Sequence, residues 1–377
     1  MNKSQVVLFA AIAPSLSAWG NSPAYSVQFY RPQPGFEHLE TGITHLNNQG
    51  QVVLTHFPDQ RDISHYEIGP LDGQRTVVER NQGDWTYEIR KLHDNGHMTV
   101  GQFNYFTAES YAARYENGAF SRFSDIPFIT TSGTSDGGFA GRVLRGQPQR
   151  PFPTVLKDGR LQEYTSILQW GGISDINENG FAVGYMIRPN DPTFYPAGWK
   201  NGEYVSFEPQ NGVVFGGNFK VNNADMVQGW EWHWNESGTQ KVDSPAVWKD
   251  GKVTRYRRID QREAWWPTGG FNIHGDYAFE ARDIDDRTGE WLNRESYVVL
   301  AGQTYALNDL LPPEYRDTFF YSTAMNDHRW IAGSARDPQT GRIRAFVMRP
   351  VPEPATVVGL ALGTVALLRR RQRGSSA

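Results

Sequence analysis

The chain has 377 residues, a formal net charge of −4 at pH 7 and no cysteine. The missing cysteine excludes disulfides, cysteine nucleophiles and thiolate metal sites, and the slightly acidic balance argues against a nucleic-acid partner, which would need a basic face. Thirty-eight glycines and 22 prolines, with few long helical patterns, favour a protein of many short strands and turns.

The N-terminus has the pattern of a secretory signal. Lys3 supplies a positive start, residues 6–13 form an apolar run, and small residues near Ala18 and Ala24 offer cleavage sites. We therefore expect residues 1–24 to be a signal peptide that is removed on export. A buried first strand is the alternative.

Residues 25–350 repeat one pattern of four short strands. In the clearest copy, residues 173–207, a turn of Asn-x-x-Gly type begins at Asn177, because Asn and Gly tolerate positive φ, and an Asn201-Gly202 hairpin precedes the last strand. Six further copies follow the same order, with turn anchors 42 to 54 residues apart. The seven anchors are Asn47, His93, Ser135, Asn177, Asn222, Asn272 and Asn326.

The spacing of these copies predicts the architecture. One four-stranded unit cannot bury both of its faces, so it needs copies of itself on either side. A period of about 40 to 50 residues with four strand signals is typical of propeller blades. The sequence therefore predicts an all-β, seven-bladed β-propeller over residues 25–350, as one domain, with the anchor asparagines on a common ring around its axis. A β-sandwich with frequent turns is the alternative.

Two of the units also carry a family resemblance. The motif Ile-Asn-x-x-Gly-x-x-x-Gly at Asn177, followed about 20 residues later by Ala-Gly-Trp-Lys-Asn-Gly, and the similar unit around Trp248 resemble the HAF repeat of extracellular proteins. This resemblance implies fold and location far more than an activity. Three units depart from it: Gly138 is expected to shorten a strand, His274-Gly275 to shift a turn, and Arg329 replaces a glycine.

The seventh unit lacks a fourth strand, because the prolines from Pro350 onward cannot donate to a strand ladder. Residues 25–30 alternate, are rich in aromatics and have no unit of their own. An unclosed ring would leave exposed strand edges that invite pairing with other chains. We therefore predict that residues 25–30 pair antiparallel with the strand around Phe346 and close the ring.

The last 27 residues, 351–377, form a separate segment. A Pro-Glu-Pro motif at residues 352–354 is followed by an apolar run, residues 355–368, and an arginine cluster at residues 369–373. This order resembles the PEP-CTERM sorting signal of Gram-negative bacteria, which usually also make exopolysaccharide. The residues assigned to sorting and processing are Pro352, Glu353, Pro354, Arg369, Arg370, Arg371 and Arg373.

The resemblance implies a partner and a route. Exosortase, a membrane protease-transpeptidase, would recognise and cleave the tail, and the protein would then reach the cell surface or the extracellular space. Before processing, the apolar run would hold the chain in the inner membrane as a helix, with the arginines on the cytoplasmic side. An ordinary single-span anchor is the alternative.

Tryptophans are the first candidate ligand-binding residues. Three of them alternate along one predicted strand and therefore share one face, and two more precede the next unit. Exposed indole rings would stack on the apolar faces of sugars, whereas buried ones would fill the space between neighbouring blades. The candidates are Trp230, Trp232, Trp234, Trp265 and Trp266.

The sequence shows no catalytic or metal site. Asp283, Asp285 and Asp286 have a faint calcium-loop pattern, but a plain hairpin turn explains them as well. No Ser/His/Asp arrangement is visible, although propeller enzymes assemble their sites from separate blades, which spacing cannot reveal. We predict no catalytic residues, no metal ligands and no cofactor.

These observations predict an exported, exosortase-sorted surface or extracellular-matrix protein that binds exopolysaccharide or another surface partner without catalysis. The alternatives are a propeller hydrolase or lyase that acts on glycans, and a structural filler of the matrix. The mouth of the central channel discriminates between them. Two or more carboxylates with a basic residue there favour an enzyme, and an apolar or filled channel favours a binding protein.

Overall fold

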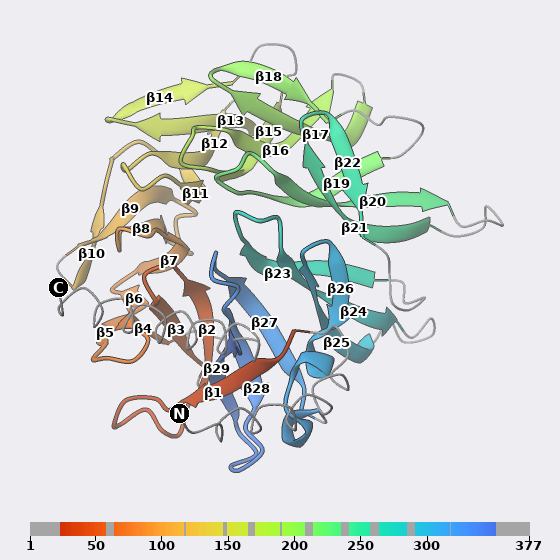
Figure 1. Cartoon of the computed structure of the whole chain (residues 1–377). Coiled ribbons are helices and arrows are strands. Elements are labelled where there is room, and N and C mark those ends of the chain that lie inside the picture. Colours follow the sequence, from red (N-terminus) through yellow and green to blue (C-terminus); the bar gives the residue numbers. More distant parts are fainter. Residues whose placement is uncertain are drawn as a thin grey trace, which may run out of the picture.

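The structure is a computed structural model. It describes residues 23–57, 64–116, 118–145, 149–164, 170–188, 191–207, 214–234, 241–256, 264–284, 291–316 and 318–351. In these ranges the chain forms seven antiparallel sheets arranged around a central axis, and no α-helix (Figure 1). The predicted all-β, seven-bladed propeller is confirmed.

Each sheet is one blade, with its first strand at the axis and its last strand at the rim. The first three blades are β2 (Glu40–Leu46), β3 (Gln51–Phe57), β4 (His65–Pro70), β5 (Thr76–Glu79); β7 (Trp85–Leu92), β8 (Met98–Phe103), β9 (Ser110–Glu116), β10 (Ala119–Arg122); and β11 (Ile129–Gly133), β12 (Phe139–Arg145), β13 (Arg150–Lys157), β14 (Arg160–Glu163). A two-residue strand, β6 (Asn81–Gln82), pairs with β7.

The remaining blades keep the same order. The fourth to sixth blades are β15 (Trp170–Ile176), β16 (Ala182–Arg188), β17 (Asp191–Lys200), β18 (Glu203–Ser206); β19 (Val214–Val221), β20 (Val227–Trp234), β21 (Lys241–Lys249), β22 (Lys252–Arg255); and β23 (Ala264–Phe271), β24 (Tyr277–Ile284), β25 (Trp291–Leu300), β26 (Gln303–Ala306). The seventh blade is β27 (Phe320–Met325), β28 (Ile331–Arg336), β29 (Ile343–Pro350) and β1 (Tyr25–Tyr30). Two 3₁₀ turns, η1 (Leu307–Leu310) and η2 (Pro313–Tyr315), precede this blade.

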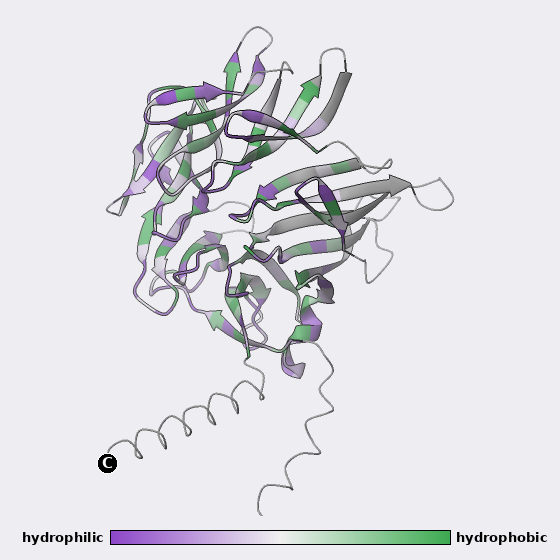
Figure 2. Cartoon of the chain, turned by 45° about the horizontal axis from the view of Figure 1, so that its top comes forward, coloured by the Kyte–Doolittle hydropathy of each residue, from purple (hydrophilic) through white to green (hydrophobic). Residues whose placement is uncertain are grey.

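The core lies between neighbouring blades rather than inside any one sheet. Ile173, Ala197 and Trp199 of the fourth blade, for example, pack against Ala140 and Val155 of the third. Apolar residues accordingly recur in every blade (Figure 2). Burying both faces of each sheet in this way explains why a single unit could not fold alone.

The ring closes where the sequence predicts. Strand β1 pairs antiparallel with β29, with Tyr25 opposite Pro350 and Phe29 opposite Phe346. The amide of Val351 also donates to the carbonyl oxygen of Ala24 at 2.8 Å. The two ends of the described chain therefore lie side by side at the outer edge of the seventh blade (Figure 1).

The anchor turns correct three expectations from the sequence. Each turn needs a residue with positive φ three positions after its anchor, and Gly275 supplies it in the sixth blade at the usual place, so this turn is not shifted. Its counterpart Gly137 follows Thr134, which makes Thr134 rather than Ser135 the anchor of the third blade. Strand β12 is not shortened by Gly138 either, since it is seven residues long, as is its counterpart β16 in the fourth blade.

Two turns adopt the same conformation without glycine. Asp225 has φ 56° and Arg329 has φ 60° at this position. Both side chains form ion pairs, Asp225 with Lys200 at 2.6 Å and Arg329 with Asp276 at 2.7 Å. These contacts offset part of the strain of a left-handed conformation, which is of order 1 kcal/mol.

The propeller has two distinct ends. We call the end that carries the turn at residues 47–50 and its six equivalents the turn face, and the opposite end the loop face. Because Met348 pairs with Ile331, which follows the Asn326 turn directly, β29 ends at the turn face. Both described chain ends, Ala24 and Val351, therefore leave the propeller at the turn face.

Candidate functional site

Five anchor asparagines link neighbouring blades around the axis. In the fourth blade, Oδ1 of Asn177 accepts hydrogen bonds from the amides of Asn179 and Phe181, at 3.1 and 2.9 Å, and Nδ2 donates to the carbonyl oxygen of Asn222 at 2.8 Å. One side chain thus holds its own turn and the next blade. The same link runs from Asn47 to His93, from Asn222 to Asn272, from Asn272 to Asn326 and from Asn326 to Asn47.

This arrangement confirms that the anchor asparagines lie on a common ring. All five are buried, with at most 5% of their surface exposed. A buried primary amide that lost these partners would leave several polar groups unsatisfied, at about 1–3 kcal/mol each. The ring therefore fixes the mouth of the channel on the turn face.

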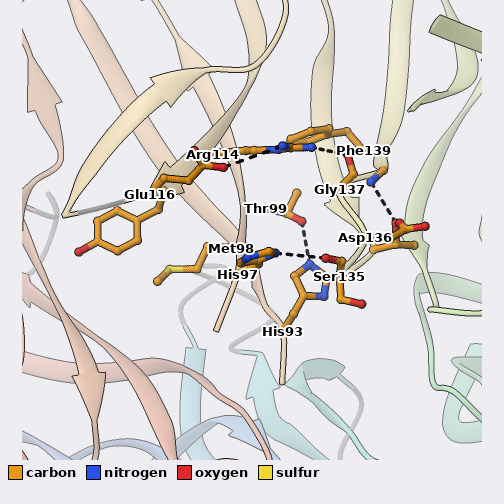
Figure 3. A pocket seen from close by; sticks show the side chains of 13 residues that line it. His93, His97, Met98, Thr99, Arg114, Glu116, Ser135, Asp136, Gly137 and Phe139 are labelled. Carbon is orange, nitrogen blue, oxygen red and sulfur yellow. Dashed lines mark hydrogen bonds and ion pairs between the residues drawn. The ribbon is translucent and has the colours of Figure 1, made fainter. Parts of the chain in front are cut away.

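The junction between the second and third blades uses other residues (Figure 3). His93 replaces the anchor asparagine, and its ring binds Thr99 and Glu178 instead of the third blade. Asn95 and His97 contact the carbonyl oxygen of Ser135, at 3.2 and 3.3 Å. A small pocket of about 140 Å³ lies between the second and third blades at this junction.

Glu178 connects three blades at once. Its Oε1 lies 2.9 Å from Nδ1 of His93 in the second blade, and its Oε2 accepts bonds of 2.7 Å from the amide and the hydroxyl of Ser135 in the third. Burial raises the pKa of this carboxyl, but the bonds from His93 and Ser135 outweigh burial and lower it to about 2. The carboxylate is therefore ionised at neutral pH.

Two further carboxylates stand at the channel mouth. Asp94 accepts bonds of 2.8 Å from the amide and side chain of Asn48. Asp327 accepts bonds of 2.7 Å from the amide of Ile273 and the side chain of Asn48. Together with Glu178 and Lys91 they line a cavity of about 150 Å³.

Below the mouth, the inner strands enclose a cavity of about 610 Å³. Nζ of Lys91 donates to the carbonyl oxygen of Ile176 at 2.6 Å and lies 3.6 Å from Oδ1 of Asp175. Burial raises the pKa of Asp175, but the charges of Lys91 and Lys220 and the bonds from Ser132 and the Val221 amide outweigh burial, so its pKa is lowered. The channel is therefore neither apolar nor filled.

His45 lies on the opposite wall of this cavity. Burial and the nearby charges of Lys220 and Arg90 lower the pKa of its imidazole to about 4. The imidazole is therefore neutral at neutral pH, and the cations of the channel are lysines and an arginine.

Two or more carboxylates with a basic residue at the channel mouth are the sequence-based sign of an enzyme. Three carboxylates and Lys91 meet there, so this criterion favours the enzymatic alternative. Each carboxylate, however, accepts hydrogen bonds that hold neighbouring blades together. Charged residues at a propeller mouth can thus have a structural role, and the criterion does not separate that role from catalysis.

The candidate tryptophans lie on two adjacent blades, from the middle of β20 to its loop-face end and at the loop-face start of β23. Trp230, Trp232 and Trp234 are on β20, and Trp265 and Trp266 are at the start of β23. Trp230 is half-buried, and the side chains of the other four lie outside the described part of the structure. Their role in ligand binding stays a prediction.

The sequence reasoning missed an exposed pair of aromatics on the same face. Tyr105 and Phe106 are 63% and 86% exposed on the loop between β8 and β9. Oδ1 of Asn104 accepts hydrogen bonds from the backbone amides of Phe106 and Thr107, at 2.9 and 3.0 Å. The backbone amide of Asn104 donates to the carbonyl oxygen of Glu109. The signal available in the sequence was an asparagine followed directly by two aromatics between two strands.

The described residues contain no group of three or more His, Cys, Asp or Glu side chains that could hold a metal ion. Within the same ranges, no helix has the length and apolar character needed to span a membrane. The sorting residues, 352–354 and 369–373, lie outside the described ranges, as does most of the predicted signal peptide.

Comparison with known proteins identifies the C-terminal segment. Residues 350–372 match the PEP-CTERM protein-sorting motif. The motif indicates export, sorting to the cell surface and processing by exosortase, as the sequence predicts. No curated protein matches the chain.

Solved structures resemble the propeller at low identity. A catalytically inactive virginiamycin B lyase from Staphylococcus aureus, with quinupristin, is 12% identical, with 87% of this chain and all of that chain covered and a TM-score of 0.47. The β-propeller domain of the Trilobed protease from Pyrococcus furiosus is 9% identical, with 83% and 86% covered and a TM-score of 0.35. A puromycin-hydrolysing peptidase from Mycobacterium tuberculosis is 10% identical, with 86% and 56% covered and a TM-score of 0.45.

Proposed function

We propose that this exported propeller is a surface or extracellular-matrix protein that binds glycans, exopolysaccharide foremost, through its loop face. The observation that carries the proposal is the position of the chain ends. Val351, at the start of the sorting motif, leaves the propeller at the turn face. A protein held or delivered through that end presents the opposite, loop face to its surroundings.

The loop face offers rigid aromatic side chains. Tyr105 packs edge-on against Phe103, with ring centroids 4.7 Å apart, while Phe106 projects into solvent. Because the Asn104 bonds already order the loop, a ligand that stacks on Phe106 would pay little additional ordering entropy. The tryptophans at the ends of β20 and β23 would extend the same surface on the opposite side of the ring.

Other parts of the proposal follow from the sequence patterns. The fourth and fifth blades carry HAF-type repeats, which suit an extracellular protein. The apolar run, residues 355–368, would form a transmembrane helix in an inner-membrane intermediate before exosortase acts. The producing cell would embed the mature protein in a biofilm matrix.

The binding surface is tested by pull-down of the purified full chain on exopolysaccharide from the producing bacterium. Phe106→Ala and Trp232→Ala are expected to weaken binding, each by about tenfold, since an aromatic contact contributes roughly 0.5–1.5 kcal/mol beyond its buried area. Leu144→Ala is the matched control, because Leu144 is an exposed apolar residue at the loop-face end of β12 that cannot stack. No retention of the unmodified protein would remove the proposal.

A second candidate, a hydrolase or lyase acting on glycans, is favoured by the carboxylates and Lys91 at the mouth. Incubation with the same polysaccharide would then shorten it and release new chain ends. Asp94→Asn should abolish this release. An unchanged size distribution after prolonged incubation contradicts the enzymatic candidate.

A further inference from the structure

We infer that the central channel contains a binding site for a small oxyanion, the carboxylate or phosphate group of a molecule about as large as a monosaccharide. This site lies on the axis, away from the aromatic loop, and does not depend on the proposed function. Its walls come from the innermost strands, so no single stretch of sequence reveals it.

The charges that face the cavity are unequal. Arg90 and Lys91 on β7 and Lys220 on β19 line it, and Asp175 on β15 is the carboxylate among them. Arg90 also pairs with Glu88, which in turn binds Arg80, so that this outer group adds one cation and one anion. The balance in the cavity is therefore positive.

The carboxylate of Asp175 already accepts hydrogen bonds from within the protein. Its Oδ1 accepts the amide of Ile176 and the hydroxyl of Ser132, and its Oδ2 accepts the amide of Val221 at 3.0 Å. Among the described residues, Lys220 has no carboxylate within ion-pair distance. A half-buried ammonium that faces a cavity without a direct partner can bind an anion with little competition.

Three features define the ligand. A cavity of about 610 Å³ lies within the range of small-molecule sites and takes a single sugar-sized molecule. Leu46, Leu92 and Phe271 give part of its wall an apolar surface. Asp94, Glu178 and Asp327 form a negative layer at the mouth, which repels a polyanionic chain more strongly than a single anionic group. The ligand is therefore a small molecule with one oxyanion and a partly apolar body.

Isothermal titration of the purified full chain at constant ionic strength tests the site, with glucuronate, inorganic phosphate and neutral glucose as probes. Glucuronate, phosphate or both should bind saturably below about 10 mM, and glucose should not. Binding of glucuronate alone identifies a carboxylate ligand, and binding of phosphate alone identifies a phosphate ligand. Saturable binding of neither anion, or equal binding of glucose, would overturn the inference.

Lys220→Met should weaken anion binding by at least about tenfold, because it removes the charge and keeps the length of the side chain. Lys252→Met is the matched control on an exposed hairpin of the same blade and should leave the affinity unchanged. The midpoint of thermal unfolding without ligand shows whether each variant folds, and Lys220→Gln replaces Lys220→Met if that variant does not. Phe106→Ala should bind the anion normally even if it loses glycan binding. Equal affinity in the Lys220 variant and the unmodified protein would overturn the inference.

Discussion

Two halves of the ring hold neighbouring blades together by different chemistry. From the fourth blade through the seventh to the first and on to the second, neutral asparagine side chains bridge each junction, and the carboxylates Asp94 and Asp327 only add to these bridges. Around the third blade, ionised side chains accept the bonds instead: Glu178 from Ser135 and Asp175 from the hydroxyl of Ser132. One blade geometry can thus be held by neutral or by ionic links, and only the ionic links should respond to pH.

The largest effect is expected from removing the buried carboxylate of the ionic half. Asp175→Ala deletes the acceptor of three hydrogen bonds and leaves Lys91 without its ion-pair partner. We expect the free energy of unfolding to fall by about 3–5 kcal/mol, as when one partner of a buried pair is lost. Urea denaturation measures it, with the exposed Asp125→Ala as control, and a loss below about 1 kcal/mol would show that Asp175 does not hold this junction.

Removing an anchor asparagine from the neutral half should lower the free energy of unfolding by a somewhat smaller amount. Asn222→Ala removes the acceptor for the amides of Ala224 and Met226 and the donor to Asn272. We expect a loss of about 2–4 kcal/mol in the free energy of unfolding. Thr134→Ala, at the anchor that forms no such bridge, should cost about 1 kcal/mol, and equal losses at the two anchors would refute the distinct role of the asparagines.

Acid should separate the two halves. The folded-state pKa of Glu178 is about 2, below its usual 4.5, so its contribution to stability is complete above pH 4.5 and is lost as the pH falls toward 2. Glu178→Gln should therefore be less stable than the unmodified protein at pH 6, and the difference should shrink steadily below pH 4.5. Glu203→Gln, on an exposed hairpin of the same blade, should show no such convergence.

The smallest effect comes from converting one junction to the other type. Thr134→Asn places an amide at the anchor of the third blade, where Thr134 now accepts only the amide of Gly138 within its turn. A new bridge to the carbonyl oxygen of Asn177 should raise the free energy of unfolding by about 0.5–1 kcal/mol. Thermal unfolding of the single variant checks this, and a lower midpoint would mean that the third blade cannot accommodate the asparagine.

The repeated turns made the fold predictable, whereas the site depended on contacts that spacing does not encode. The Asn-x-x-Gly period located all seven blades, and the unassigned residues 25–30 identified the closing strand. Thr134 was missed because it stands beside another hydroxyl residue, Ser135, in a degraded copy. The role of Glu178 required knowing that His93 and Ser135 converge from two other blades, and the exposure of Phe106 is a tertiary property.

Amide hydrogen exchange tests the central claim, that the ring has a neutral and an ionic half, most directly. Between pH 5 and about pH 2, after correction for intrinsic exchange, the amide of Ser135 should lose protection because its acceptor, Glu178, whose pKa is about 2, is increasingly protonated. The amides of Ala224 and Met226, which donate to Asn222, should keep theirs over the same range. Equal loss of protection at Ser135 and at the two amides that donate to Asn222 would contradict the account.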